Sequence, residues 1–433
     1  MTTLELDSSI QLDPAQSQQK KRLLIIAHNH PLFAPGGAEI AAYDLFKTIR
    51  GSGQYETFFL AAAAGINRKI HEGTPFQTIV NQPDEVLFWG DAYDYFYHSQ
   101  QIMNFMYVDF KKFLQQLKPD VIHFHHFVRV GLEAIEIARQ VLPSVKIVFT
   151  IHEYLLICYR DGQMVRKHTN ELCEYASPDR CHQCFPEYSP QKFKMREVFI
   201  KSHLNLVDQF ISPSHFLANR FIEWGIPQEK MRVLENGRQV VSPAPHRVLQ
   251  EGEKRNIFGY FGQINPYKGV ILLLEAVQYL VKSEFTDFHL ELFGNVASGF
   301  PNFHEKFFEF LDDYKENISY NGKYKQPEIP QLIKDVDWVI VPSTWWENSP
   351  LVIQEVFMHK RPIICSNIGG MAEKVENNIT GLHFRVRNAV SLAKVMKKSC
   401  SDSQLWERCV GNIGPRLSME ESAREHIELY SVM

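Results

Sequence analysis

The sequence predicts an α/β protein made of two doubly wound units in tandem, each a parallel sheet with helices on both faces. Strand and helix patterns alternate along almost all of its 433 residues. Short, continuous apolar runs such as residues 22–27 are typical of parallel strands buried on both faces. The alternation breaks over residues 240–253, where polar and turn-forming residues predict a linker.

The first unit is predicted over residues 21–245. It begins with a strand at residues 22–27, a loop containing Gly36 and Gly37, and a helix at residues 38–50. Apolar runs predict its later strands at residues 57–62, 120–125, 146–151, 209–212 and 231–234.

The second unit is predicted over residues 250–412, and a helical pattern within residues 413–433 could cross back onto the first unit. Its helices are expected at residues 269–282 and 350–359. Two facing units of this class form a cleft, because ligands bind beyond the carboxyl ends of parallel strands. The strands of the second unit are expected at residues 256–261, 288–293, 337–341 and 362–365.

The composition excludes some classes of protein. A net charge of -4 argues against broad, nonspecific binding to nucleic acid. The sequence contains no apolar run of the roughly 18 residues that span a membrane. Residues 1–20 are polar, lack the apolar region of a secretory signal and are expected to be a disordered lead-in. We therefore expect a cytoplasmic protein.

One basic and apolar segment, residues 192–201, allows two interpretations. It could be an amphipathic helix that docks peripherally at the inner face of the membrane. The favoured alternative is a helix that faces the core and exposes a solvated basic side.

Three polar or glycine-rich segments follow predicted strands of the second unit, and they carry the residues of a candidate anion site. Lys268 supplies a point charge suited to a diphosphate. Pro350 fits the first position of a helix, whose N-terminus presents free N–H groups to an anion. Glu347 precedes this helix and Glu355 lies within it. Each feature alone is more often a turn or a surface residue, but their grouping at strand ends indicates a binding site.

The run from Phe258 to Gly269 and the Glu-x7-Glu spacing of Glu347 and Glu355 resemble the family-4 retaining glycosyltransferases. The resemblance covers most of the chain. It implies the GT-B fold, in which two Rossmann-like units face a central cleft, a nucleoside-diphosphate sugar as donor, retention at the anomeric carbon, and no metal requirement. Smaller matching pieces are Gly36-Gly37-Ala38-Glu39, Ile211-Ser-Pro-Ser214 and Asn236-Gly237.

The resemblance assigns roles to residues at the donor. Lys268 is expected at the diphosphate, Glu347 at the hydroxyls of the transferred sugar, and Glu355 at the ribose. Tyr324 lies where the family holds the base. The remaining expected donor contacts are Gly37, Gly262, Gln263, Asn295, Asn348, Ser349, Pro350 and Leu351.

One departure from the family affects the diphosphate site. Where the family often has arginine, this chain has Gln263, which carries no charge. Neutralisation of the diphosphate would then depend on Lys268, with Lys323 or Arg255 as candidate helpers.

Histidines are dense in the first unit. By resemblance, His152 is expected at the transferred sugar, and we count it with Lys268 and Glu347 among the catalytic residues. The acceptor pocket is expected to contain Gly36, Gly37, His125 and His126. A zinc site made of His123, His125 and His126 is a less favoured alternative.

These features predict a transferase that moves a hexose-type sugar from the donor to a glycan, a lipid-linked or a small-molecule acceptor. One alternative keeps the fold but changes the reaction, to a sugar-nucleotide epimerase or a phosphorylase. The other is a non-catalytic protein that binds nucleotide-sugars.

Four of the seven cysteines, Cys158, Cys173, Cys181 and Cys184, lie in an insertion at residues 158–190. An odd total argues against a disulfide framework. The C-x2-C pair and its two upstream partners fit a structural zinc site that would stiffen the loop. Four free thiols in a surface loop are the alternative. No cofactor is expected to be required for catalysis.

Overall fold

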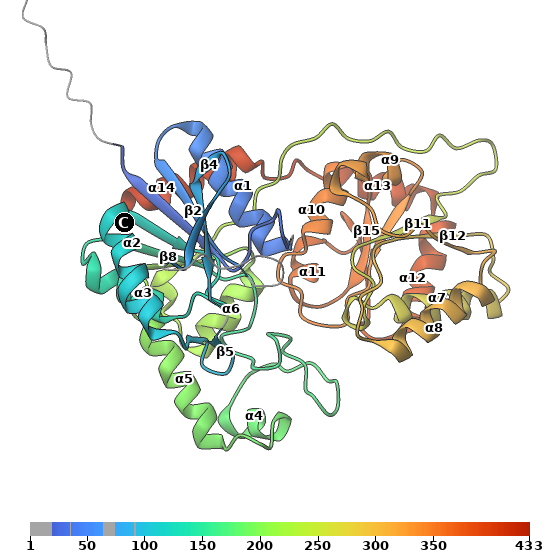
Figure 1. Cartoon of the computed structure of the whole chain (residues 1–433). Coiled ribbons are helices and arrows are strands. Elements are labelled where there is room, and N and C mark those ends of the chain that lie inside the picture. Colours follow the sequence, from blue (N-terminus) through green and yellow to red (C-terminus); the bar gives the residue numbers. More distant parts are fainter. Residues whose placement is uncertain (1–19, 35, 64–73, 91) are drawn as a thin grey trace, which may run out of the picture.

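The computed structural model describes residues 20–34, 36–63, 74–90 and 92–433, and it contains two large sheets (Figure 1). The first has the strand order β10-β9-β8-β7-β1-β2-β4-β3 and the second the order β13-β12-β11-β14-β15-β16. All neighbouring strands within them are parallel except β3 and β4. The predicted α/β class is therefore confirmed. Of the expected lead-in, only Lys20 lies within the described residues.

The first sheet belongs to the N-terminal half, drawn in blue to green in Figure 1. Its strands are β1 (Arg22–Ala27), β2 (Glu56–Ala63), β3 (Phe76–Ile79), β4 (Gln82–Trp89), β7 (Val121–Phe124), β8 (Lys146–Thr150), β9 (Gln209–Ser212) and β10 (Met231–Val233). The other elements of this half are α1 (Gly37–Ser52), β5 (Tyr93–Asp94), β6 (Ser99–Gln100), η1 (Phe105–Phe110), α2 (Lys111–Leu117), α3 (Glu133–Val141), α4 (Pro178–Cys184), α5 (Pro190–Leu204), α6 (His215–Trp224) and η2 (Gln228–Lys230).

The second sheet forms the C-terminal half, drawn in yellow to red. Its strands are β11 (Ile257–Phe261), β12 (His289–Phe293), β13 (Ile318–Tyr320), β14 (Trp338–Val341), β15 (Ile363–Ser366) and β16 (Gly381–Phe384). Its helices are η3 (Pro266–Lys268), α7 (Val270–Lys282), α8 (Pro301–Asp313), η4 (Gln326–Glu328), α9 (Ile329–Ile333), α10 (Leu351–Met358), α11 (Gly369–Lys374), α12 (Ala389–Ser401) and α13 (Ser403–Asn412). The last helix of the chain, α14 (Met419–Val432), lies against the N-terminal half.

Apolar side chains pack on both faces of each sheet. In β1, Leu24 and Ile26 belong to one core cluster, whereas Leu23 and Ile25 belong to another. The same division holds in β14, where Trp338 and Val339 belong to different clusters. Burial on both faces explains why these strands are continuous apolar runs rather than alternating ones.

The chain crosses between the two halves twice, and the crossings touch each other. After β10, the backbone of Arg238 pairs with the segment before α14: its N–H donates to the carbonyl of Leu417, and its carbonyl accepts from the N–H of Met419. Helix α14 then packs on α1 in the N-terminal half (Figure 1). The Tyr430 hydroxyl and His123 Nδ1 form a hydrogen bond of 2.7 Å there.

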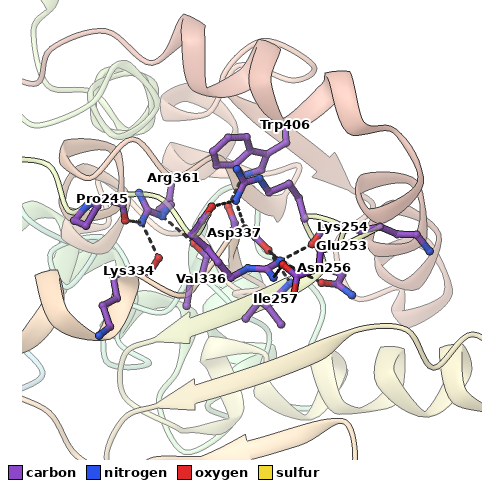
Figure 2. Close-up of polar contacts among 12 residues, drawn as sticks. Pro245, Glu253, Lys254, Asn256, Ile257, Lys334, Val336, Asp337, Arg361 and Trp406 are labelled. Carbon is purple, nitrogen blue, oxygen red and sulfur yellow. Dashed lines mark hydrogen bonds and ion pairs between the residues drawn. The ribbon is translucent and has the colours of Figure 1, made fainter. Parts of the chain in front are cut away.

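Three arginines fasten the linker to the C-terminal half, and Figure 2 shows the surroundings of the buried one, Arg361, and of Asp337. Arg247 and Arg255 both donate to the carboxylate of Asp337, at 2.7 and 3.1 Å. Arg361, which is 0% exposed, donates instead to backbone carbonyls. These carbonyls belong to Ala244, Pro245, Lys334, Val336 and His359. The linker is therefore held from Ala244 onward, although its composition resembles that of a free loop.

Helix α5 contains the basic and apolar segment at residues 192–201, and it buries one face. Phe193 and Ile200 lie in the interior together with Arg196, whereas Met195 and Val198 are exposed. Arg196 is therefore not part of a solvated basic side. It donates to the carbonyls of Phe96, Leu155 and Leu156. Among the described residues, no helix combines the length and apolarity needed to cross a membrane.

The four cysteines of the insertion line one small cavity next to α4. Their thiols are free, and burial raises the pKa of Cys158 and raises that of Cys181 to about 12. The Cys173 thiol donates to the carbonyl of Tyr175 at 3.2 Å. As arranged here, the described part of the chain holds no group of three or more histidine, cysteine or acidic side chains that could bind a metal ion. Zinc binding therefore stays a prediction.

Replacing Arg361 tests the fastening of the linker. Arg361→Met removes the donor to five backbone carbonyls, and each buried carbonyl left without a partner costs desolvation energy. We expect the free energy of unfolding to fall by about 3 kcal/mol or more, measured by urea denaturation. The matched control Arg232→Met changes an exposed arginine and should stay within about 0.5 kcal/mol of the parent. An Arg361 variant as stable as the control would contradict this account.

Metal content tests the cysteine insertion. If the four thiols rearrange around zinc, protein purified without chelator should carry about one equivalent of zinc, and a chelator should lower its melting temperature. Replacing Cys181 and Cys184 with serine should abolish this zinc. Elemental analysis showing less than about one tenth of an equivalent would leave the four free thiols as the correct interpretation.

Candidate active site

A cleft of about 690 Å³ lies between the carboxyl ends of the two sheets, where the doubly wound class places its ligands. Segments from both halves line it. The N-terminal half contributes His28, Gly36, Gly37, Ala38, Glu39, Ile40, His126, His152, Glu153, Tyr154, Asp161, Gly162 and Pro213, with Asn236 from the first crossing. The C-terminal half contributes Gln263, Lys268, Tyr324, Trp345, Trp346, Glu347, Asn348, Ser349, Pro350 and Leu351.

Lys268 and Glu347 form an ion pair on the wall of this cleft. Lys268 ends η3, whose start is capped by the side chain of Asn265, and its Nζ lies 2.6 Å from Oε1 of Glu347. The same Oε1 accepts hydrogen bonds from Ser343 at 2.7 Å and from Trp345 at 2.8 Å. Burial alone would raise the pKa of Glu347, but Lys268 and these donors outweigh it, so the net pKa is lowered. Glu347 is therefore a carboxylate at neutral pH.

The loop from Glu347 to Pro350 approaches the N-terminus of α10. Pro350 is the N-cap and Leu351 the first helical residue, so the expectation that Pro350 occupies the first helical position is wrong by one residue. Pro350 has a ψ of 119°, and this extended backbone turns the chain into the helix instead of beginning it. The start of α10, where the backbone N–H groups have no partner within the helix, still borders the cleft, since Leu351 lines it.

Two polar atoms in this loop are buried without a hydrogen-bond partner in the described structure, Asn348 Oδ1 and Ser349 Oγ. Both residues line the cleft, so these atoms are candidates for ligand contacts. The Asn348 amide meanwhile donates to the carbonyl of His152 at 2.5 Å, which joins the two walls.

Gly370, which the sequence analysis missed, supports this loop. A Cβ on Gly370 would lie 1.6 Å from the carbonyl oxygen of Asn348, so glycine is required for the contact. Its N–H donates to the carbonyl of Glu347 at 2.7 Å. The Gly369-Gly370 pair, which follows the predicted strand at residues 362–365 after three intervening residues, was the available signal.

The remaining donor candidates divide into two groups. Gln263 and Tyr324 line the cleft. They also line a smaller cavity of about 160 Å³, together with Gly262. Asn295 is exposed and lies outside both linings, but its carbonyl accepts from the N–H of Ile264 and so holds the Gly262 loop.

The proposed helpers at the diphosphate are not placed there. Arg255 is bound to Asp337 in the linker cluster, with its guanidinium 4.0 Å from the ring centre of Trp406. Lys323 does not line the cleft either. Among the described residues, Lys268 is therefore the one lysine or arginine that lines the cleft.

His152 faces the same cleft from the N-terminal half. Its Nε2 lies 3.0 Å from Nδ1 of His125, and burial lowers its pKa to about 3. His152 is therefore neutral at physiological pH and can exchange hydrogen bonds without carrying charge. His125 lies behind it, outside the cleft lining, with its Nε2 buried and without a partner in the described structure.

Two histidine–carboxylate pairs complete this wall. His126 Nε2 lies 2.5 Å from Oε1 of Glu153, and His28 Nε2 lies 2.9 Å from Oε1 of Glu39. Burial raises the pKa of Glu153 to about 7. Burial would also raise the pKa of Glu39, but hydrogen bonds from His28 and Asn29 lower it to about 2. Glu153, which was not among the site residues predicted from the sequence, lines the cleft and is thus a candidate contact for an acceptor hydroxyl.

The alternative zinc site made of histidines does not assemble. His123 is engaged by Thr150 and Tyr430, and His126 is paired with Glu153. These histidines thus form hydrogen bonds with other groups of the protein, and His125 forms one with His152.

Glu355 lies in α10, one and a half turns beyond the cleft loop. Its Oε1 accepts hydrogen bonds from Arg238 and from Gln326. It borders a second cleft of about 590 Å³ between α1 on one side and α9 and α10 on the other. The two glutamates therefore face neighbouring parts of one interdomain groove.

Comparison with known proteins agrees with this arrangement. Residues 35–240 match the family model described as glycosyltransferase family 4, and residues 242–413 match the model of glycosyl transferases group 1. Among solved structures, HepE from Anabaena in complex with UDP has a TM-score of 0.67 at 16% identity, covering 95% of this chain and 100% of that one. Sucrose-phosphate synthase from Thermosynechococcus elongatus has a TM-score of 0.68 at 16% identity, covering 95% and 99%.

Curated relatives match a smaller share of this chain than the solved structures do. A UDP-Gal:alpha-D-GlcNAc-diphosphoundecaprenol alpha-1,3-galactosyltransferase of Escherichia coli is 26% identical over 41% of this chain and 46% of its own length. A lipopolysaccharide 1,2-N-acetylglucosaminetransferase of Salmonella typhimurium is 28% identical over 51% and 61%. The chain thus matches about half the length of these curated relatives. The two family models and the structural neighbours nevertheless lead to one conclusion: the chain belongs to the family-4 glycosyltransferases and has their GT-B fold.

Proposed function

We propose that this protein transfers a hexose-type sugar from a nucleoside-diphosphate sugar to a glycan, lipid-linked or small-molecule acceptor, with retention at the anomeric carbon. The observation that carries the proposal is the Lys268–Glu347 pair beside the N-terminus of α10, with Glu355 further along the same helix. A cation and free N–H groups suit a diphosphate, and two separate carboxylates suit two sets of sugar hydroxyls.

The donor would lie along the C-terminal wall. Lys268 retains further N–H donors beyond the one directed at Glu347, and these would bind the diphosphate together with the N-terminus of α10. Glu347 would accept hydrogen bonds from hydroxyls of the transferred sugar. Glu355 would accept them from the ribose, with the base near Tyr324. The solved complexes of HepE with UDP and with UDP-glucose support a donor of this class.

The acceptor would enter from the N-terminal wall, past Gly36 and Gly37. A front-face reaction fits this arrangement. The acceptor oxygen bonds to the anomeric carbon, the bond from that carbon to the diphosphate oxygen breaks, and the acceptor proton passes to the departing diphosphate. Lys268 would stabilise the charge that develops there, and neutral His152 would hold a hydroxyl of the sugar. No enzymic nucleophile and no cofactor enters this scheme.

We also propose a cytoplasmic site of action, with peripheral contact at the inner membrane face if the acceptor is lipid-linked. The lipid-linked substrate in the name of the Escherichia coli relative motivates this second part. Sedimentation with liposomes containing anionic lipid tests it, and absence from the pellet would remove the membrane contact.

Lys268→Ala tests the proposed chemistry. Loss of one preorganised cation at the leaving group should lower turnover by about a hundredfold or more. The melting temperature must be measured alongside, because the change also leaves Glu347 without its cation. Lys306→Ala, which removes a half-exposed lysine of α8 outside the cleft, is the matched control and should retain full turnover. Near-normal turnover in Lys268→Ala would contradict the assignment.

A donor panel separates the proposal from its alternatives. UDP-, GDP-, ADP- and dTDP-sugars are incubated with and without glycan and lipid-linked acceptors, and release of nucleoside diphosphate is followed. We expect release that an acceptor stimulates, with a product of unchanged anomeric configuration by NMR. Isomerised donor without release would indicate an epimerase, and dependence on phosphate a phosphorylase. Tight binding without any turnover would indicate a binding protein.

A further inference from the structure

Arg238 occupies the first crossing between the two halves, and its backbone is fixed on the second crossing. Beside it, a Cβ on Gly237 would lie 2.5 Å from the carbonyl oxygen of Ser418, so the two crossings pack directly against each other. The position of Arg238 is therefore set by both crossings together, as the bridge between Arg238 and Ser418 shows.

From this position the Arg238 side chain reaches the donor helix. The side chain is only 3% exposed, and its Nη2 donates to Oε1 of Glu355. Gln326 donates to the same oxygen at 3.2 Å. Within the described part of the chain, the hydrogen bonds that Glu355 accepts all end on Oε1. The second oxygen, Oε2, is thus available to a ligand in the neighbouring cleft.

Glu355 needs a cation such as Arg238 beside it in order to stay ionised. Its carboxyl group is largely buried, and burial raises its pKa while the charge and hydrogen bond of Arg238 lower it, with a net rise. Without Arg238, burial would favour the protonated form still more. A protonated or reoriented carboxyl group is a weaker acceptor for a hydroxyl than a fixed carboxylate.

Neighbouring contacts hold the same part of α10. Gln354 donates to Oε1 of Glu235 at 2.8 Å and to the carbonyl of Asn236 at 3.0 Å, both on the first crossing. Lys374 forms an ion pair with Glu235 at 2.9 Å. The crossing is therefore seated on α10 beside Arg238, which restricts the directions from which the guanidinium can reach Glu355.

We propose that Arg238 is a positioning residue for the donor: it engages Oε1 of Glu355 and so presents Oε2 to the hydroxyls of the donor ribose. This inference rests on the proposed function, which places the ribose at Glu355. It goes beyond that proposal by making the preference for ribose over a sugar without these hydroxyls depend on Arg238. This residue lies on the first crossing between the two halves, outside the C-terminal sheet.

The test compares each ribonucleoside diphosphate with its 2′,3′-dideoxy analogue by calorimetry on the full-length protein. The probe is whichever of UDP, GDP and ADP binds most tightly. A hydrogen bond to a charged group contributes about 1.5–3 kcal/mol, so the parent should prefer the ribose form by about tenfold or more. In Arg238→Met the preference should fall below about threefold. Arg238→Lys, which keeps the charge, should restore part of it.

The outcomes separate this inference from the proposed function. If the parent shows no preference for ribose, the placement of ribose at Glu355 fails, and the inference fails with it. If the parent discriminates but Arg238→Met discriminates equally well, the ribose site stands and the role of Arg238 is refuted. Equal weakening of both ligands in Arg238→Met would show a purely structural role and would also refute it.

A double-mutant comparison guards against a variant that merely folds poorly. In a Glu355→Gln background the preference should already be low, and adding Arg238→Met should change it by less than about twofold. A further large loss in that background would mean that Arg238 acts on the ribose by a route other than Glu355, which would overturn the inference.

Discussion

The cleft wall of the C-terminal half depends on one ion pair, between the partly exposed Lys268 and the buried Glu347. A carboxylate buried at this depth needs a cation and hydrogen-bond donors, and Glu347 obtains all of them at one oxygen. The pair joins the loop after β11 to the loop after β14, so two strand ends are fixed by a single contact. Gly370 holds the second loop from behind. The charge that would meet a donor is therefore already in place before any ligand binds.

The sequence was sufficient to predict the fold class and the centre of the site. Strands buried on both faces, such as β1, are visible as continuous apolar runs, and strand ends in one sheet necessarily converge. Lys268, Glu347 and the start of α10 could therefore be grouped from local patterns alone. The one-residue error at Pro350 is of the usual kind, because a proline before a helix fits the N-cap and the first turn almost equally well.

What the sequence could not show are contacts between residues far apart in the chain. Arg196, in the segment expected to expose a basic side, is buried against backbone carbonyls of residues 96, 155 and 156. Arg255, a candidate helper at the diphosphate, forms an ion pair with Asp337 instead. Composition alone does not distinguish an exposed arginine from one that fills a buried cluster of acceptors. The same limit applies to Arg238, whose partner Glu355 lies 117 residues away.

These long-range arginines hold the linker at both ends and leave the exposed residues 239–243 between the two anchors. From Ala244 onward it is fixed to the C-terminal half by Arg361, and up to Arg238 it is seated on α10 and on the second crossing. Any change of angle between the two sheets has to be absorbed by the few residues between these anchors and by the paired segment before α14. Since Arg238 is itself one anchor, such a change would act on Glu355, and opening of the cleft would be linked to the ribose contact proposed for Glu355.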